Sequence, residues 1–144
     1  MSTQFCRAVN AGDVPGVKIN TPPYDRIIKL LCSPSIARKS QNFAVGISVI
    51  PFGHIHEEHQ HPSEEVIYIL SGKGEITINS IEIVRLERNS VVILKANEPH
   101  SIIVTSPDED LTCLWVYAPP GPEVKFAAGA GCPMMNPVNH EKTL

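Results

Sequence analysis

The placement of prolines and glycines constrains the fold of this chain more than any other feature. Thirteen prolines and nine glycines lie almost entirely between short apolar, β-branched runs and not inside them. The runs that we interpret as strands span residues 42–50, 65–70, 74–79, 81–86, 91–95, 101–105 and 111–117. Short strands separated by turn residues, without a long segment of helical periodicity, predict an all-β sandwich or barrel.

Local patterns add detail to this prediction. Ile76 and Ile78 alternate with polar residues, and Asn79-Ser80 then predicts a tight hairpin turn, because Asn tolerates a positive φ. Residues 24–31 fit a buried strand or a single helical turn, and we favour the strand. We expect one domain: a core over about residues 24–120, an N-terminal arm (1–23) and a Pro/Gly-rich C-terminal tail (121–144).

Composition limits the classes of function. The 144 residues are 42% hydrophobic, enough for one core, and the net charge of -3 argues against nucleic-acid binding. No apolar stretch approaches the roughly 20 residues of a membrane span. The start of the chain lacks the basic and apolar regions of a signal peptide, so we expect a cytoplasmic protein. In that reducing compartment we expect free thiols at Cys6, Cys32, Cys113 and Cys132.

Histidines are concentrated in one short segment. His54, His56, His59 and His61 fall within eight consecutive residues. In a strand, His59 and His61 would point to one face about 6.6 Å apart, so both rings could reach one cation. Pro62-Ser63 then turns the chain, which lets a carboxylate of the next strand reach the same point. Neutral imidazole and carboxylate together are a ligand set for a divalent transition metal.

A further candidate ligand lies far away in the sequence. His100 follows Pro99 and precedes the strand predicted at 101–105, a position from which a barrel can aim the imidazole inward. Three imidazoles and one carboxylate would leave one or two positions of an octahedral ion for water or substrate. An open position of this kind distinguishes a reactive metal site from a structural one.

These residues resemble the two conserved motifs of the cupin superfamily over about residues 42–120. The first motif is matched without a gap by Gly53, His59, His61, Glu65 and Gly72. The second is matched more loosely, by the strand 91–94 and by Pro99-His100. Four positions depart from its usual residues: Asn89, Lys95, Asn97 and Val104. Only one motif pair is present, which is typical of a single-domain cupin.

The resemblance implies a small jelly-roll β-barrel, usually a homodimer, with one divalent metal (Fe, Mn, Ni or Zn) in its mouth. The implied ligands are His59, His61, Glu65 and His100. The family spacing to Gly72 selects Glu65 over Glu58 and Glu64. We expect His54 and His56 in a loop at the rim, Gly72 in a turn, and Trp115 and Tyr117 in the core.

The leading functional hypothesis is a metal-dependent enzyme acting on a small molecule, with an oxygenase as first guess beside lyase, isomerase and decarboxylase chemistry. Apolar walls would exclude solvent, and proton-transfer candidates flank the site, although no catalytic residue is assigned. The wall residues are Ile67, Ile69, Ile93 and Ile102, and the proton-transfer candidates are Glu57, Glu64 and Tyr68. The alternatives are a metal-holding sensor or carrier without turnover, and a metal-free scaffold or sugar-binding barrel.

Overall fold

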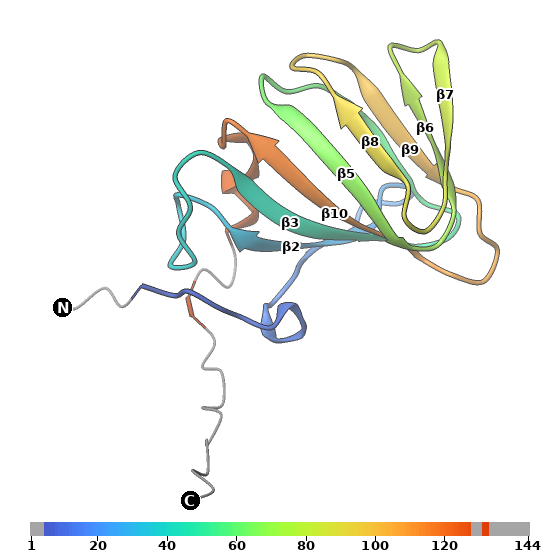
Figure 1. The fold of residues 1–144 in the computed structure, drawn as a ribbon. Helices are drawn as coiled ribbons and strands as arrows, with labels where there is room; N and C mark the ends of the chain where they lie inside the picture. The colour runs from blue at the N-terminus through green and yellow to red at the C-terminus, as the bar shows by residue number, and fades with distance from the viewer. Residues whose placement is uncertain (1–4, 128–130, 133–144) are drawn as a thin grey trace, which may run out of the picture.

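The structure, a computed structural model, describes residues 5–127 and 131–132. Its strands form two antiparallel sheets, in the orders β1-β2-β3-β10-β5-β8 and β4-β9-β6-β7 (Figure 1). The strands are β1 (Val17–Ile19), β2 (Arg26–Cys32), β3 (Ala44–Ile50), β4 (Ile55–His59), β5 (Glu64–Ser71), β6 (Gly74–Ile78), β7 (Glu82–Leu86), β8 (Val91–Leu94), β9 (His100–Val104) and β10 (Leu111–Ala118). Two 3-10 turns, η1 (Ala11–Asp13) and η2 (Pro122–Phe126), complete the described elements.

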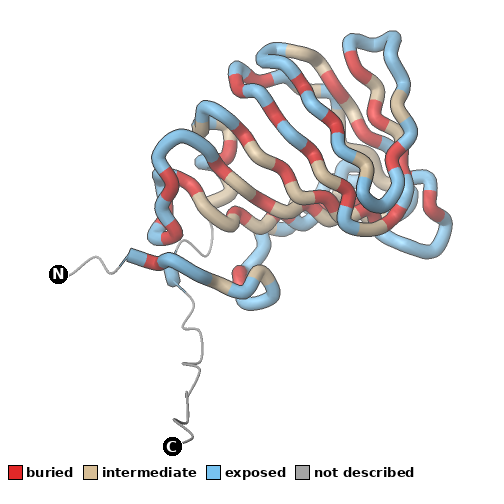
Figure 2. Tube along the Cα trace, in the orientation of Figure 1, coloured by how far each residue is buried: buried red, intermediate tan, exposed pale blue. Residues whose placement is uncertain are grey.

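The core lies between the two sheets. Buried and more exposed residues alternate along most strands, as the pleat requires (Figure 2). Ile69 and Leu94 of the larger sheet and Ile76 and Ile102 of the smaller one belong to one buried cluster. The all-β prediction is confirmed: the chain is a jelly roll of two facing sheets, which do not close into a continuous barrel.

Turn residues adopt the conformations that their chemistry favours. Asn79 and Ser80 have φ of 52° and 60°, which confirms the hairpin predicted between β6 and β7. Gly72, with φ of 84°, makes the turn after β5. Asn89 and Asn97 have φ of 73° and 62° at two positions where cupins usually carry glycine. Asn reaches this left-handed region at low cost, so these two departures leave the backbone path intact.

Two strands were not predicted from the sequence. Each predicted run overlaps a strand, and residues 24–31 overlap β2, as favoured. However, β1 lies within the expected arm and pairs with β2 through Val17 and Ile28. The second addition, β4, reads Ile-His-Glu-Glu-His and lacks apolar alternation. Its partner β9 stabilises it, with His56 opposite Ile102 and His59 opposite His100.

The arm and the tail meet in a disulfide between Cys6 and Cys132. The prediction of four free thiols is therefore wrong for these two cysteines and holds for Cys32 and Cys113. The bond joins positions 126 residues apart, so no local spacing announces it. The rest of the predicted tail, 133–144, lies outside the described residues. Within the described part of the chain, no helix is both long and apolar enough to span a membrane.

Candidate metal centre

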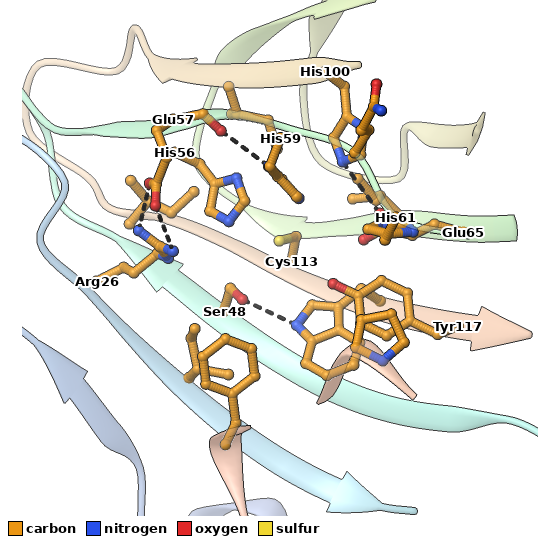
Figure 3. A pocket seen from close by; sticks show the side chains of 18 of the residues that line it. Arg26, Ser48, His56, Glu57, His59, His61, Glu65, His100, Cys113 and Tyr117 are labelled. Carbon is orange, nitrogen blue, oxygen red and sulfur yellow. Dashed lines mark hydrogen bonds and ion pairs between the residues drawn. The ribbon is translucent and has the colours of Figure 1, made fainter. Parts of the chain in front are cut away.

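Both sheets contribute side chains to a cavity of about 200 Å³ (Figure 3). His59 ends β4 and His100 begins β9, directly opposite each other in the smaller sheet. Glu65 is the second residue of β5 in the larger sheet, and His61 lies in the connection between β4 and β5. The structure thus brings together all four sequence-predicted ligands. The strand expected across His59 and His61 ends at His59, yet their ring centroids are only 5.7 Å apart.

The donor atoms converge at distances that suit one ion. One ligand nitrogen each of His59, His61 and His100 lies within 4.8 Å of the other two. Glu65 Oε2 lies 2.9 Å from His61 Nε2 and 3.3 Å from His100 Nε2. Neighbouring donors of an octahedral ion with bonds of about 2.1 Å are about 3 Å apart. The three imidazoles therefore form a group that could hold one divalent metal, and Glu65 lies beside two of them.

Backbone carbonyls orient all three imidazoles. The Nδ1 atom of each ring lies within hydrogen-bond distance of a carbonyl oxygen two residues away: His59 with Glu57 at 2.9 Å, His61 with Ser63 at 3.0 Å, and His100 with Glu98 at 2.8 Å. A carbonyl only accepts, so Nδ1 carries the proton and donates. The lone pair of each neutral ring then lies on Nε2, the atom that faces the other rings. Metal-binding histidines usually donate the N–H of their other ring nitrogen to a group of this kind, which fixes the orientation of the ring.

The electrostatics of the metal-free cluster follow from its burial and its hydrogen bonds. Burial lowers the pKa of His59 to about 4, although the carbonyl of Glu57 works in the opposite direction. Burial opposes charge on Glu65 and His100, but it is outweighed by their hydrogen bonds together with the attraction of the neighbouring opposite charges. The pKa of Glu65 is therefore lowered and that of His100 raised. An ionised carboxylate lies next to imidazole rings that are neutral or can release a proton. Such a set of groups can bind a cation.

These shifts predict how the stability of the metal-stripped protein depends on pH. The stabilisation from His100 is complete below the unfolded pKa of 6.5 and is lost as pH rises through the higher folded value. The stabilisation from Glu65 is present above 4.5 and is lost as pH falls through the lower folded value. The buried, neutral His59 and His56 lose stability as pH falls below 6.5, because the unfolded chain takes up their protons first. We therefore expect maximal stability near pH 6.5. Thermal unfolding at a series of pH values measures it. If the melting temperature of His100→Gln fell with rising pH as steeply as that of wild type, the role of His100 would be contradicted.

His56 is one of the cavity residues that the sequence interpretation missed. It lies in β4 and lines the cavity, so the prediction of a rim loop is wrong for His56. Its ring centroid is 4.3 Å from that of His59, on the side away from Glu65 (Figure 3). Burial holds the pKa of His56 well below its usual value, and its buried Nδ1 has no partner. His54, in contrast, precedes β4 and lies 3.1 Å from Asp25.

A buried arginine closes another side of the cavity. Arg26, only 6% exposed, donates two hydrogen bonds to Glu57, at 2.8 and 3.3 Å. Glu57 thus lines the cavity with its charge already paired. The other two proton-transfer candidates are wrong: Glu64 is exposed at the start of β5, and the Tyr68 hydroxyl donates to Asn89 outside the cavity.

The remaining walls are apolar and aromatic. Trp115 and Tyr117 stack with ring centroids 4.6 Å apart, and Trp115 Nε1 donates to Ser48. Both are buried in the core, as predicted, and also line the cavity. Phe126 of η2 adds a wall from the C-terminal segment.

Two of the predicted wall residues lie elsewhere. Ile67 and Ile102 line the cavity as predicted. Ile69 instead fills the core, and Ile93 is 73% exposed on the outside of the sheet. The error for Ile93 has a simple cause: inward and outward residues alternate, and β8 buries Val92 and Leu94.

A family model described as "Cupin domain" matches residues 46–117. An uncharacterized protein of Streptomyces coelicolor, SCO3923, is 32% identical over 82 residues, which cover 57% of this chain and 75% of that protein. Residues 46–117, which the family model matches, include all four candidate ligands.

Three solved structures share the fold. A predicted oxalate decarboxylase of Thermotoga maritima superposes with a TM-score of 0.68 and 22% identity over 78% of this chain and 99% of that one. The polyketide cyclase RemF of Streptomyces resistomycificus gives 0.67 and 19%, over 80% of each chain. The DMSP lyase DddQ of Ruegeria pomeroyi gives 0.64 and 21% over 74% of this chain, which spans only 57% of that one. At these identities the similarity shows the fold alone.

Proposed function

The chain belongs to the cupin family, and from this premise we propose that it is a metal-dependent enzyme acting on a small molecule. His59, His61, Glu65 and His100 would hold the ion. One observation carries the proposal: three imidazoles, each fixed through Nδ1 by a backbone carbonyl, turn Nε2 toward one another and toward a buried carboxylate. A divalent ion bound there supplies a Lewis acid with positions open to substrate or water.

The cavity selects the size and chemistry of the substrate. About 200 Å³ is below the 300–1,000 Å³ of most drug-sized ligand pockets, so the substrate is small. The imidazoles and Glu65 share the lining of the cavity with Trp115, Phe126 and isoleucines. The indole N–H is already bonded to Ser48. We therefore propose a substrate with an oxygen-bearing head for the ion and a compact apolar or planar body.

The chain's own residues position and shield such a substrate. The unpartnered Nδ1 of His56 offers a hydrogen bond beside the ligand cluster. Burial and the charge of Glu65 raise the pKa of Tyr117, so its hydroxyl stays protonated and can donate. Burial raises the pKa of Cys113 to about 12, which keeps this thiol protonated and unreactive.

The structural neighbours support catalysis without selecting a reaction. They include a predicted oxalate decarboxylase, a polyketide cyclase and a DMSP lyase. Oxygenation is the first reaction to test, because neutral imidazoles and one carboxylate suit Fe(II) and leave room for dioxygen and substrate. The other classes are tested by the same assay with Mn, Ni or Zn.

A substrate screen tests the proposal. The full chain, reconstituted separately with Fe, Mn, Ni and Zn, is incubated with small hydroxy acids, phenols and keto acids, with and without air. We expect turnover with one metal and substrate class, and loss of turnover in His61→Ala. Saturable binding without conversion under every condition would contradict the enzyme hypothesis.

One observation favours a second candidate, a binding module that holds metal and ligand without turnover. Apart from the candidate ligands, four titratable side chains of the cavity are poorly suited to transfer a proton at neutral pH. The pKa of His56 is far below neutrality, those of Cys113 and Tyr117 are far above it, and Glu57 is paired with Arg26. A carrier needs no proton-transfer group, whereas a lyase or isomerase does.

His56→Phe tests the proposed contact with substrate. Phenylalanine keeps a planar ring but removes both nitrogens, so one substrate hydrogen bond is lost while the metal ligands remain. We expect metal content within a factor of two of wild type and an apparent substrate affinity about 10-fold lower, as one lost hydrogen bond implies. Elemental analysis measures the metal content, and calorimetric titration of the metal-loaded protein measures the substrate affinity. An equal loss of metal and substrate binding would instead make His56 a metal ligand.

A further inference from the structure

The segment that follows β10 forms one wall of the candidate metal cavity. Its 3-10 turn η2 contributes three of the lining residues: Pro122, Lys125 and Phe126. Phe126 and the following Ala127 are half-buried against the core, and Lys125 is exposed to solvent. We call residues 119–127 the cap. The cap belongs to neither sheet, so the strands can keep their pairing when the cap moves away from the cavity.

Two serines anchor the cap through hydrogen bonds. Ser63 Oγ donates to the carbonyl of Pro119 at 2.5 Å, and Ser33 Oγ donates to the carboxylate of Glu123 at 2.7 Å. Glu123 also accepts from the N–H of Gly121, which belongs to the cap itself. The Glu123 side chain is buried, and among the described residues it forms no ion pair. Burial of a carboxylate without a cation opposes the closed position, so these contacts hold the cap weakly.

A disulfide ties the chain beyond the cap to the N-terminal arm. Cys132 follows Phe126 by six residues and is bonded to Cys6, where the arm passes beside residues 131–132 (Figure 1). The arm is itself fixed to the larger sheet, because β1 pairs with β2 and Lys29 Nζ donates to the carbonyl of Ala11. The disulfide thus joins the weakly held cap to a firmly held part of the fold.

We propose that the Cys6–Cys132 bond is a redox-sensitive latch on the cap. While the bond is intact, the cap stays closed and the cavity keeps its small volume. A bond between positions 126 residues apart strongly restricts the chain, because the entropic cost of closing a loop grows with its length. After reduction, hydrogen bonds and the packing of Phe126 hold the cap, so it opens more often and widens the cavity. Any effect on turnover rests on the proposed function, whereas the opening itself does not.

The exposure of the two cysteines determines where a reductant attacks. Cys132 is exposed, whereas Cys6 is buried. A thiolate of an external dithiol attacks Cys132 Sγ, and Cys6 Sγ leaves with the bonding electron pair and takes up a proton. The second thiol of the reductant then displaces Cys132, which also becomes a thiol. The chain gains two electrons and two protons, and the dithiol is oxidised to its own disulfide.

The nearby thiol of Cys32 does not open the latch. Cys32 lines the same surface pocket as Cys6. Burial raises the pKa of the Cys32 thiol, although Ser40 works in the opposite direction. The thiolate is the attacking species in disulfide exchange, so a protonated Cys32 is a poor nucleophile. The latch therefore responds to an external thiol.

Fluorescence quenching of Trp115 tests the proposal on the full chain. Trp115 is the only tryptophan of the sequence, is buried and lines the cavity. The chain is oxidised with glutathione disulfide or reduced with dithiothreitol, and both forms are treated with chelator and desalted so that their metal content is equal. We expect the acrylamide quenching constant to be at least about threefold higher in the reduced form, because local opening exposes the indole.

Two variants separate the latch from other effects of the reductant. Cys132→Ser removes the bond at its exposed end, so it should match the reduced wild type with or without dithiothreitol. Cys32→Ser is the matched control, because it removes a thiol beside the same pocket and keeps the disulfide. We expect Cys32→Ser to respond to the reductant as the wild type does.

Trypsin provides a second measurement, because Lys125 lies in the cap. Cleavage after Lys125 requires local opening, so we expect it to be at least about tenfold faster in the reduced form. Arg88, exposed in the turn between β7 and β8, is the internal control, and cleavage there should not change. Mass spectrometry of the fragments over time measures both rates.

Two results would overturn the proposal. Equal quenching and equal cleavage after Lys125 in the two forms, with circular dichroism showing both folded, would mean that non-covalent contacts keep the cap closed. Four reactive thiols in the denatured chain after treatment with glutathione disulfide would mean that the bond does not form. A substrate screen without turnover would count against the proposed function alone, because neither measurement of the cap depends on catalysis.

Discussion

His59→Ala is expected to weaken binding of a divalent metal by about 100-fold or more. Loss of a residue that only supports a ligand already costs 10- to 100-fold in affinity, and His59 offers a ligand nitrogen directly. His59 is half-buried, neutral near pH 7 and outside the Glu65 hydrogen bonds, so the variant should fold. Calorimetric titration of the metal-stripped chain with Zn²⁺ and Mn²⁺ measures the loss.

His54→Ala is the matched control for this variant. His54 belongs to the same histidine-rich segment, but it lies before β4 and contacts Asp25. We expect wild-type affinity from it. Equal affinities in His54→Ala and His59→Ala would show that the histidine cluster binds metal without the geometry described above.

Gly72→Ala is expected to destabilise the fold by about 3 kcal/mol or more. Gly72 has φ of 84°, a region that costs an L-residue about 1–2 kcal/mol. A Cβ there would lie 2.3 Å from the carbonyl oxygen of Asp110 and 2.8 Å from Leu111 Cα. Both atoms belong to the backbone at the start of β10, so relief requires moving a strand that pairs with β3 and β5. Urea denaturation measures the free energy of unfolding.

Gly53→Ala separates the two causes of this effect. Gly53 has a similar φ of 80°, but nothing lies within 4 Å of a Cβ placed there. Only the backbone strain remains, so we expect a loss of about 1 kcal/mol. Equal losses in the two variants would rule out the predicted clash with the start of β10.

Short-range patterns explain why most strands and the four candidate ligands could be found from the sequence. The β6–β7 hairpin follows from alternation and from Asn79-Ser80, because both signals act within a few residues. The spacing of His59, His61 and Glu65 similarly reflects one turn between two strands. His100 is distant, but Pro99 and the strand after it mark its position. The structure brings these four side chains together, and their metal binding stays a prediction.

The features that were missed depend on long-range contacts. β4 has no apolar alternation and is a strand because it pairs with β9. For this reason His56, which we expected in a rim loop, lies in a strand and lines the cavity. Arg26 would normally be exposed, but Glu57, 31 residues away, compensates its burial. The Cys6–Cys132 bond depends on where the arm and the tail meet. Such partners are defined only once the sheets have formed.

Metal analysis of the purified full chain tests the central claim most directly. The chain is stripped with chelator, reloaded, desalted and measured by elemental mass spectrometry beside Glu65→Gln treated in the same way. Glutamine keeps the size of the side chain but removes the charge that two imidazoles contact. We predict one divalent ion per wild-type chain and at least a tenfold smaller amount in Glu65→Gln. A wild-type content near zero, equal to that of the variant, would contradict a metal centre at this site.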